Sequence, residues 1–176
     1  MIVAGIDQST KTGLVLLEDS INGVLFHDEL TGPTRFDHSI DRALSISDQV
    51  LGPITAHKPD LVVFEGYGYA SQSLAVSVEI GTILRLVARR MGIAFVEIPP
   101  NVLKKYLTGK GNANKEAMML SVYKRFGFEA YTNNVGDAFA LASAGLCILG
   151  ADVPVPASQV DYLRSSVDLP KGYKMH

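Results

Sequence analysis

The chain has 176 residues, 47% of them hydrophobic and 19% charged, with a net charge of −2 at neutral pH. The length allows one domain with a substantial core, and the composition is that of a globular protein and excludes a disordered one. No apolar run reaches the roughly 18 to 20 residues of a membrane span, the N-terminus lacks a basic signal leader, and Cys147 has no partner for a disulfide. We therefore expect a cytoplasmic protein without a membrane anchor.

The N-terminal part of the chain predicts three neighbouring strands. Residues 2–7 are an apolar run that ends in an acid, as expected of a buried strand whose end opens on a site. Residues 13–18 and 24–27 are apolar runs on either side of an Asn-Gly pair, which is typical of a β-hairpin. We expect an antiparallel arrangement, with residues 2–7 in the middle of the sheet because they are apolar throughout.

Helices and strands alternate in the next part of the chain. Apolar residues recur at helical spacing between residues 36 and 56, and residues 61–65 form a second apolar run that ends in an acid. An aromatic, glycine-containing loop at residues 66–69 leads to a helix expected at residues 72–90. A fifth strand is expected at residues 93–98, before two prolines.

The remaining chain predicts three further helices, at residues 101–107, 115–126 and 135–149, with a polar glycine loop between the first two. Residues 151–176 combine scattered prolines with polar residues, so we expect a tail of doubtful order there. The whole pattern predicts an α/β domain at residues 1–150. It would hold a mixed five-stranded sheet, first antiparallel and then parallel, with helices on both faces.

Three acids stand where such a fold would bring them together. Asp7 and Glu65 each end an apolar strand, and parallel neighbouring strands present their ends at one edge of the sheet, where open α/β sheets bind ligands. A strand-end acid can also be a simple polar cap. Asp137 lies in the first turn of the predicted helix 135–149. It is either a favourable partner of the helix dipole, worth about 0.3–1 kcal/mol, or a metal ligand.

A metal site would explain all three acids at once. Carboxylates a few ångströms apart repel one another unless a divalent cation lies between them. Oxygen ligands without a suitable Cys/His cluster favour a hard ion, Mg²⁺ or Mn²⁺, over zinc.

The basic residues are concentrated in one part of the chain. Residues 85–125 hold nine of the sixteen Lys and Arg residues and only two of the eighteen acids, which leaves seven basic residues against sixteen acids elsewhere. This region is either an electrostatic surface for phosphates or a set of solvated helix faces. Its basic residues are Arg85, Arg89, Arg90, Lys104, Lys105, Lys110, Lys115, Lys124 and Arg125.

Five motifs follow one another along the chain. They are Gly5-Ile6-Asp7 with Thr12-Gly13, Phe64-Glu65 with its aromatic loop, Gly81 with Arg85, the lysine-glycine segment from Leu103 to Lys115, and Asp137-Ala138-Phe139-Ala140-Leu141-Ala142. In this order they resemble the RuvC family of Holliday-junction resolvases, within the RNase H-like superfamily, over residues 1–150. The resemblance implies an RNase H-like fold.

The resemblance also implies a function and a mechanism. The expected activity is the resolution of Holliday junctions in DNA recombination and repair, by symmetric, metal-dependent hydrolysis of phosphodiester bonds. Two Mg²⁺ ions, for which Mn²⁺ would substitute, are expected about 3.5 to 4 Å apart. Asp7 would bridge both ions, Glu65 would bind one and Asp137 the other.

Two lysines of the basic region match functional positions of the family. Lys115 would stabilise negative charge near the scissile phosphate, and Lys104 would do the same or anchor the DNA backbone. Each of them is alternatively a solvated surface residue.

DNA contacts and a homodimer are further implications of the resemblance. Tyr67 and Tyr69, on either side of Gly68, are candidates for stacking on an unpaired base or, alternatively, for hydrophobic packing. Candidates for phosphate contacts are Arg85, Arg89, Arg90, Lys105 and Lys110. Because a resolvase must nick two symmetric strands, we expect an isologous homodimer, with the helix at residues 72–90 at its interface.

The sequence departs from the family pattern at Asn134. Many relatives have Asp at this position, three residues before the last acid, and some have His. Asn134 offers a metal ion a neutral carbonyl oxygen and no charge. Alternatively it caps the helix or supports the ligands from outside, and we favour this second interpretation. Glu129 is a weaker candidate to replace the missing acid because nothing fixes its distance from the site.

Other functions are alternatives at this point. A broader nuclease acting on flaps and forks would use the same acids, and a non-catalytic junction-binding protein would fit the neutral Asn134. The segment Gly5-Ile6-Asp7-Gln8-Ser9-Thr10 also resembles the phosphate loop of sugar-kinase-like ATPases. Such kinases need two large lobes, so we expect no nucleotide cofactor. The compact chain suggests a bacterial or bacteriophage origin.

Overall fold

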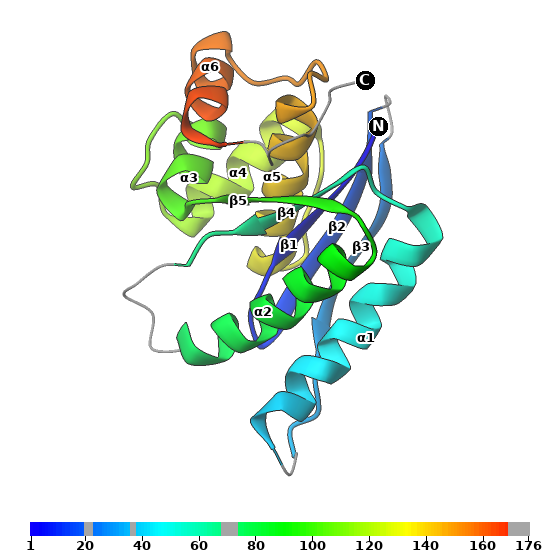
Figure 1. Cartoon of the computed structure of the whole chain (residues 1–176). Coiled ribbons are helices and arrows are strands. Elements are labelled where there is room, and N and C mark those ends of the chain that lie inside the picture. Colours follow the sequence, from blue (N-terminus) through cyan, green and yellow to red (C-terminus); the bar gives the residue numbers. More distant parts are fainter. Residues whose placement is uncertain (20–22, 36–37, 68–73, 169–176) are drawn as a thin grey trace.

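A mixed five-stranded sheet lies at the centre of the computed structural model, which describes residues 1–19, 23–35, 38–67 and 74–168 (Figure 1). The strands are β1 (Ile2–Asp7), β2 (Lys11–Glu18), β3 (Val24–Thr31), β4 (Leu61–Glu65) and β5 (Ala94–Ile98). Their order in the sheet is β3-β2-β1-β4-β5. The first three strands pair antiparallel, whereas β4 is parallel to both β1 and β5. The predicted sheet is therefore confirmed, including the central place of its first strand.

Helices cover both faces of the sheet (Figure 1). One face carries α1 (Ser39–His57) and α2 (Leu74–Arg90); the other carries α5 (Asn133–Ile148), against which α3 (Pro100–Thr108), α4 (Lys115–Phe126) and α6 (Ala157–Ser166) pack. The predicted α/β architecture with two helical layers is confirmed. None of the helices in the described part of the chain is long and apolar enough to cross a membrane.

Two hydrophobic cores, one on each face, explain why the central strands are apolar at every position. Side chains alternate along a strand, so neighbouring residues of β1 enter different cores. Val3 of β1 joins the core under α5, and Ala4 joins the core under α1 and α2. The same division holds for Val15 and Leu16 of β2.

Two glycines allow α5 to lie against the sheet at backbone distance. A Cβ atom at Gly5 of β1 would overlap the carbonyl oxygen of Ala138, and one at Gly13 of β2 would overlap the carbonyl oxygen of Asn134. Any other residue would push the N-terminal half of α5 away from the ends of β1 and β2. These glycines therefore fix where the polar start of α5 meets the sheet.

The helix α6 corrects the expectation of a poorly ordered C-terminal tail. Leu163 of this helix is fully buried in the core under α5, and the guanidinium of Arg164 donates a hydrogen bond of 2.8 Å to the carbonyl oxygen of Cys147. Pro156 stands directly before the helix, where its missing N–H removes no intrahelical hydrogen bond. The prolines thus delimit a packed helix here, and the expectation is wrong for Ala157–Ser166.

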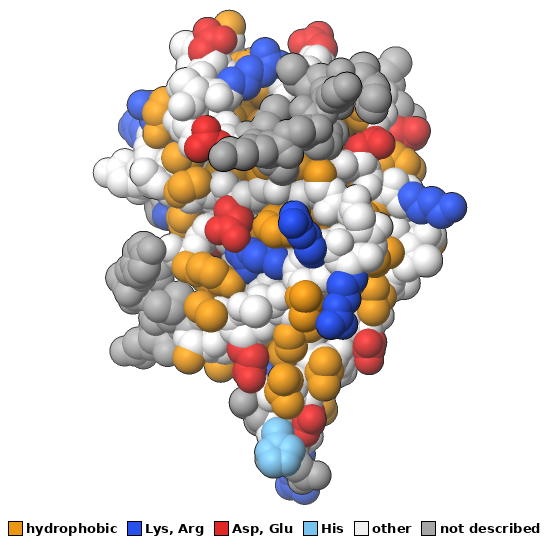
Figure 2. Space-filling model, in the orientation of Figure 1, with side chains coloured by type: hydrophobic (Ala, Val, Ile, Leu, Met, Phe, Trp, Pro, Cys, Tyr) orange, Lys and Arg blue, Asp and Glu red, His pale blue; other side chains and the backbone are white. Residues whose placement is uncertain are grey.

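Exposed hydrophobic side chains gather over α1 and α2 on the face that Figure 2 shows. They belong to both helices and to the residue after α2, and they are Ile40, Leu44, Val78, Leu86 and Met91. The helix predicted to form a dimer interface, α2, thus carries an apolar exposed side.

Gly13→Ala should destabilise the protein, because its methyl group would overlap backbone atoms of α5 that cannot rotate away. We expect the free energy of unfolding to fall by roughly 1–3 kcal/mol or more, measured by urea denaturation. Thr82→Ala, at an exposed residue inside α2, is the control. There the change should be neutral or stabilising by a few tenths of a kcal/mol, roughly the difference in helix propensity. Equal effects at both positions would contradict the proposed role of Gly13.

Candidate functional site

Asp7 and Glu65 lie side by side at the carboxyl edge of the sheet. The last registered pair of β1 and β4 is Ile6 with Phe64, and each acid is the next residue on its strand. Because Ile6 and Phe64 belong to the core under α1 and α2, alternation turns both acids to the opposite face, toward α5. Asp7 is only 8% exposed, and no described residue donates a hydrogen bond to its carboxylate.

Asp137 reaches the two strand ends from α5. Thr132 caps this helix, because its Oγ1 accepts a hydrogen bond of 3.2 Å from the N–H of Val135. The helix therefore begins at Asn133, earlier than predicted, and Asp137 stands in its second turn. Since the effect of the helix dipole falls off within the first turn, the dipole does not account for an acid here.

The three acids affect one another's ionisation. Burial raises the pKa of Asp7 well above its usual value, and the charges of Glu65, Asp137 and Glu29 raise it further. Burial, followed by the charge of Asp137, raises the pKa of Glu65 to about 7. Burial also raises the pKa of Asp137. The fold thus brings the three predicted acids into one electrostatic cluster.

The donor chemistry of this cluster fits a hard divalent cation. Carboxylate oxygens are the ligands that Mg²⁺ and Mn²⁺ prefer, and no described residue occupies those of Asp7 with a hydrogen bond. Among the described residues, however, no group of three Asp, Glu, His or Cys side chains is close enough to hold one ion. A bound cation would therefore have to draw the carboxylates together by side-chain rotation.

Lys104 and Lys115 lie near the acids, on two different helices. Both lower the pKa of Glu65 and of Asp137, and Lys115 also lowers that of Asp7. Lys115 is the first residue of α4, whose start is fixed by Asn114: its Oδ1 accepts a hydrogen bond of 2.9 Å from the N–H of Ala117. The structure therefore places the two lysines that the sequence singled out beside the acidic cluster.

The other basic residues predicted to contact DNA phosphates lie away from the acidic cluster. The ammonium of Lys105 lies 3.9 Å from the ring centre of Tyr162 on α6, a cation–π contact. Lys110, in the loop after α3, and Arg89 and Arg90, at the end of α2, are exposed.

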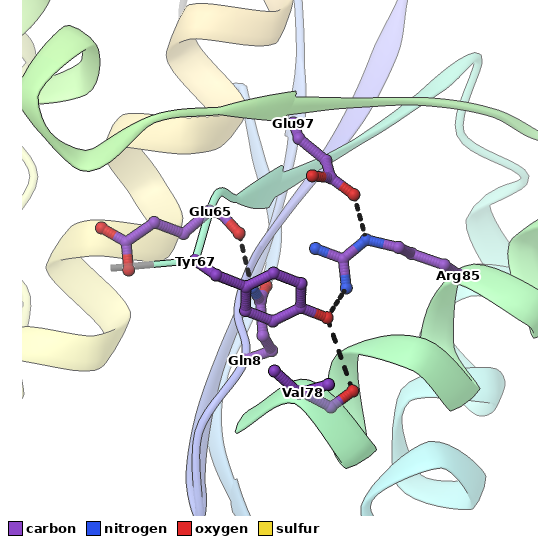
Figure 3. Close-up of polar contacts among 6 residues, drawn as sticks. All are labelled: Gln8, Glu65, Tyr67, Val78, Arg85 and Glu97. Atoms are coloured by element: carbon purple, nitrogen blue, oxygen red, sulfur yellow. Dashed lines mark hydrogen bonds and ion pairs between the residues drawn. The ribbon is translucent and has the colours of Figure 1, made fainter. Parts of the chain in front are cut away.

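Gln8 and Arg85 stabilise the chain around Glu65 (Figure 3). The Nε2 of Gln8 donates a hydrogen bond of 2.5 Å to the backbone carbonyl of Glu65, which joins the ends of β1 and β4. The Nε of Arg85 donates a hydrogen bond of 2.5 Å to Glu97 on β5, and its Nη1 donates one of 2.7 Å to the hydroxyl of Tyr67. Sequence reasoning missed the roles of Gln8 and Glu97, because only the fold brings these strands and α2 together.

These contacts contradict the predicted phosphate contact of Arg85. Its side chain is only 11% exposed, and its guanidinium carbon lies 4.8 Å from the ring centre of Phe64 and 4.7 Å from that of Tyr67. The ring of Tyr67 packs on this guanidinium, which supports the packing interpretation for Tyr67. Tyr69, the second predicted stacking residue, lies outside the described residues.

Asn134 does not cap α5, and its side chain is hydrogen-bonded to a residue of β3. The cap is Thr132, so the capping interpretation is wrong. The Nδ2 of Asn134 instead donates a hydrogen bond of 2.9 Å to Oε2 of Glu29 on β3. Sequence reasoning missed Glu29 because it ended the third strand at His27, whereas β3 continues to Thr31. Continuing the strand to Glu29 would have placed this side chain on the same face as that of His27, whereas its pairing with Gly13 follows from the register of β2 and β3.

Comparisons with known proteins agree with this arrangement. The family model for "Crossover junction endodeoxyribonuclease RuvC" matches residues 3–145. The chain belongs to the RuvC family. A RuvC protein of Gloeobacter violaceus is 31% identical over 107 residues, a match that covers 59% of this chain and 62% of that relative. The curated relative is thus matched over less than two thirds of its length.

Solved RuvC structures share the fold. The RuvC structure of Thermus thermophilus superposes with a TM-score of 0.70 at 24% sequence identity, over 87% of this chain and 99% of that one. The same protein in complex with a Holliday junction substrate superposes with a TM-score of 0.69, over 81% of this chain and 90% of that one. The predicted RNase H-like fold is confirmed by these RuvC neighbours.

We expect the metal-free protein to lose stability as the pH rises from about 5 to about 8. Folding raises the pKa of Glu65 from 4.5 to about 7, so in this range the folded state binds more protons than the unfolded state. Protonated Glu65 therefore contributes to the free energy of unfolding below its unfolded-state pKa, and this contribution is lost as the pH rises through its folded-state pKa. The loss for Glu65 is up to roughly 3 kcal/mol. Thermal denaturation in EDTA at several pH values measures this loss.

Glu65→Gln should weaken this pH dependence, the remainder of which comes from Asp7 and Asp137. It should also raise the melting temperature at about pH 8, because the amide carries no charge to bury. Glu129→Gln, at an exposed residue of the loop before α5, is the control and should leave the profile unchanged. A melting temperature that stays level with pH in the wild-type protein would contradict the clustering of the acids.

Arg85→Leu should lower the free energy of unfolding by roughly 1–3 kcal/mol, because it leaves Glu97 and the Tyr67 hydroxyl without their donor. Arg89→Leu, at an exposed residue one turn further along α2, should change it by no more than about 0.5 kcal/mol. Urea denaturation distinguishes the two. If Arg85→Leu instead left stability intact and weakened DNA binding, the guanidinium would belong to the DNA surface.

Proposed function

We propose that this protein is a structure-selective endodeoxyribonuclease that resolves Holliday junctions. The observation that carries the proposal is the convergence of Asp7, Glu65 and Asp137 at the carboxyl edge of a RuvC-family fold, with two lysines beside them. Its substrate would be four-way DNA junctions that arise in recombination and repair. Such a nuclease would work in the cytoplasm of a bacterial cell, where the DNA is.

Asp7, Glu65 and Asp137 would hold the cation, and we propose two Mg²⁺ ions per site, with Mn²⁺ able to substitute. The cations would supply activation of the attacking water and stabilisation of the leaving oxygen. The three acids are suited to this task because burial and mutual repulsion disfavour their charged forms until positive charge arrives.

Lys115 and Lys104 would bind the DNA phosphates next to the acids. They already offset part of the negative charge of Glu65 and Asp137, and a lysine ammonium stabilises charge that develops on a phosphate. Because the two lysines stand on α4 and α3, they would contact the DNA from one side of the acidic cluster. The exposed Lys110, Arg89 and Arg90 would add sequence-independent contacts with the DNA backbone.

A homodimer would place two such sites on one junction. Resolution without loose ends requires two symmetric nicks, which an isologous dimer delivers. We propose that α2 forms the interface, supported by the exposed apolar side chains of Val78 and Leu86 on this helix and by Met91 behind it.

The test is cleavage of a synthetic four-way junction with labelled strands in the presence of Mg²⁺. Wild-type protein should introduce paired nicks at symmetric positions of opposing strands. Asp7→Asn should abolish cleavage and retain binding in a gel-shift assay, because it removes a metal ligand and leaves the lysines in place. Asp161→Asn, at an exposed residue of α6, is the control and should cut like wild type.

Other outcomes of the cleavage assay would assign this protein a different function. Equal cleavage of junctions, flaps and forks would make it a broader branched-DNA nuclease. Binding without cleavage by wild-type protein in both Mg²⁺ and Mn²⁺ would make it a junction-binding protein.

A further inference from the structure

Glu29, on the edge strand β3, lies in the same cross-strand row of the sheet as Asp7 of the acidic cluster. In the sheet register Asp7 pairs with Gly13, and Gly13 pairs with Glu29. Residues paired directly across strands point to the same face, so Glu29 faces the α5 side as Asp7 does. Two inter-strand spacings, about 10 Å, separate their backbones, and the backbone of Asn134 lies against Gly13 between them. The charge of Glu29 reaches Asp7 and raises its pKa.

The Glu29 carboxylate is held in a fixed place by the start of α5. Asn134 donates a hydrogen bond to its Oε2, and the backbone N–H of Glu29 donates one of 2.9 Å to the hydroxyl of Tyr131, in the loop before α5. That hydroxyl in turn donates a hydrogen bond of 2.9 Å to Oδ1 of Asp28. The second carboxylate oxygen of Glu29, Oε1, receives no hydrogen bond from any described residue. One oxygen is thus anchored and the other is available.

Neither Asp7 nor Oε1 of Glu29 accepts a hydrogen bond within the described part of the chain, so both can ligate a cation. Asp7 is more than nine-tenths buried, yet its carboxylate oxygens are not among the buried atoms of the described residues that lack a hydrogen-bond partner. Water or a cation can therefore reach them, and a cation would offset their charge. The nearby neutral amide, Asn134, donates to Glu29 and not to Asp7. It therefore orients a second negative charge beside the first.

We propose that Glu29 is an additional metal-ligating residue on the β3 side of Asp7, and that Asn134 is the positioning residue that aims its carboxylate. The inference rests on the proposed nuclease function and deepens it. It gives the chain a fourth acid from the edge strand, although position 134 of α5 carries no charge. A purely structural tie between β3 and α5 would need only the hydrogen bond, whereas ligation needs the charge.

Glu29→Gln separates these two roles, because a glutamine Oε1 still accepts the hydrogen bond from Asn134 but carries no charge. Mn²⁺ is titrated into the protein without DNA, and its affinity is measured by isothermal titration calorimetry. We expect Glu29→Gln to weaken Mn²⁺ binding roughly 10- to 100-fold and to leave the melting temperature in EDTA unchanged or higher. Glu18→Gln removes the same charge from an exposed residue that pairs with Ile2, at the opposite end of β1 from Asp7, and should bind Mn²⁺ like wild type.

A charge-relocating double variant tests the geometry. In Glu29→Gln/Asn134→Asp the carboxylate moves to α5, and the glutamine Nε2 can donate the hydrogen bond back to it. Mn²⁺ affinity should return to within a few-fold of wild type. Asn134→Ser, which releases Glu29 without changing any charge, should weaken Mn²⁺ binding less than Glu29→Gln does. It serves as the second test of the pair should Glu29→Gln disturb folding.

The outcomes distinguish this inference from the proposed function. If Asp7→Asn abolishes Mn²⁺ binding while Glu29→Gln and Asn134→Ser bind like wild type, the metal site stands and the role of Glu29 is overturned. If wild-type protein binds no Mn²⁺, the proposed metal site fails, and the inference fails with it. Weakened binding in Glu29→Gln with restoration in the double variant supports the inference.

Discussion

The close contact between α5 and the sheet governs both the fold and the site. Backbone carbonyls of α5 occupy the space that side chains at Gly5 and Gly13 would fill. This contact brings the second turn of the helix, with Asp137, over the end of β1, where Asp7 is already buried. A helix held away by even one methyl group on either strand would separate Asp137 from Asp7 and Glu65. The close packing of α5 on the two glycines thus determines which carboxylates repel one another at the site.

The site works against the stability of the fold that contains it. Burial disfavours the charge on each acid, and the neighbouring acids add to the effect. The protein tolerates this because two apolar cores, one on each face, stabilise the same strands. Lys104 and Lys115 offset part of the negative charge from α3 and α4, which do not carry the acids. Buried acids with raised pKa values and oppositely charged neighbours are typical of functional sites.

Sequence patterns predicted the sheet and its acids because both depend on local signals. A short apolar run ending in an acid describes β1 and β4 completely, and parallel pairing then follows from the alternation of helix and strand. Charge counting failed at Arg85, since a helical arginine looks the same whether it faces solvent or Glu97 on the next strand. Pattern reading failed at Glu29 because β3 is an edge strand in which the consecutive residues His27, Asp28 and Glu29 are all polar, so the strand pattern looks as if it ends there. The prolines around α6 misled for a similar reason: they mark a boundary but not what lies beyond it.

The position of Glu29 follows from the electrostatic limits of the cluster. Asp7 lies on the central strand and is the most buried of the acids, so each further carboxylate beside it adds repulsion where solvent screens least. At the edge of the sheet, Glu29 is only partly buried, and its charge is therefore less costly to maintain in the metal-free protein. The uncharged amide of Asn134 makes this placement specific, because it binds the carboxylate without adding a charge of either sign. The neutral residue at position 134 and the acid at position 29 thus belong to one arrangement, in which the edge strand carries the negative charge that position 134 of α5 lacks.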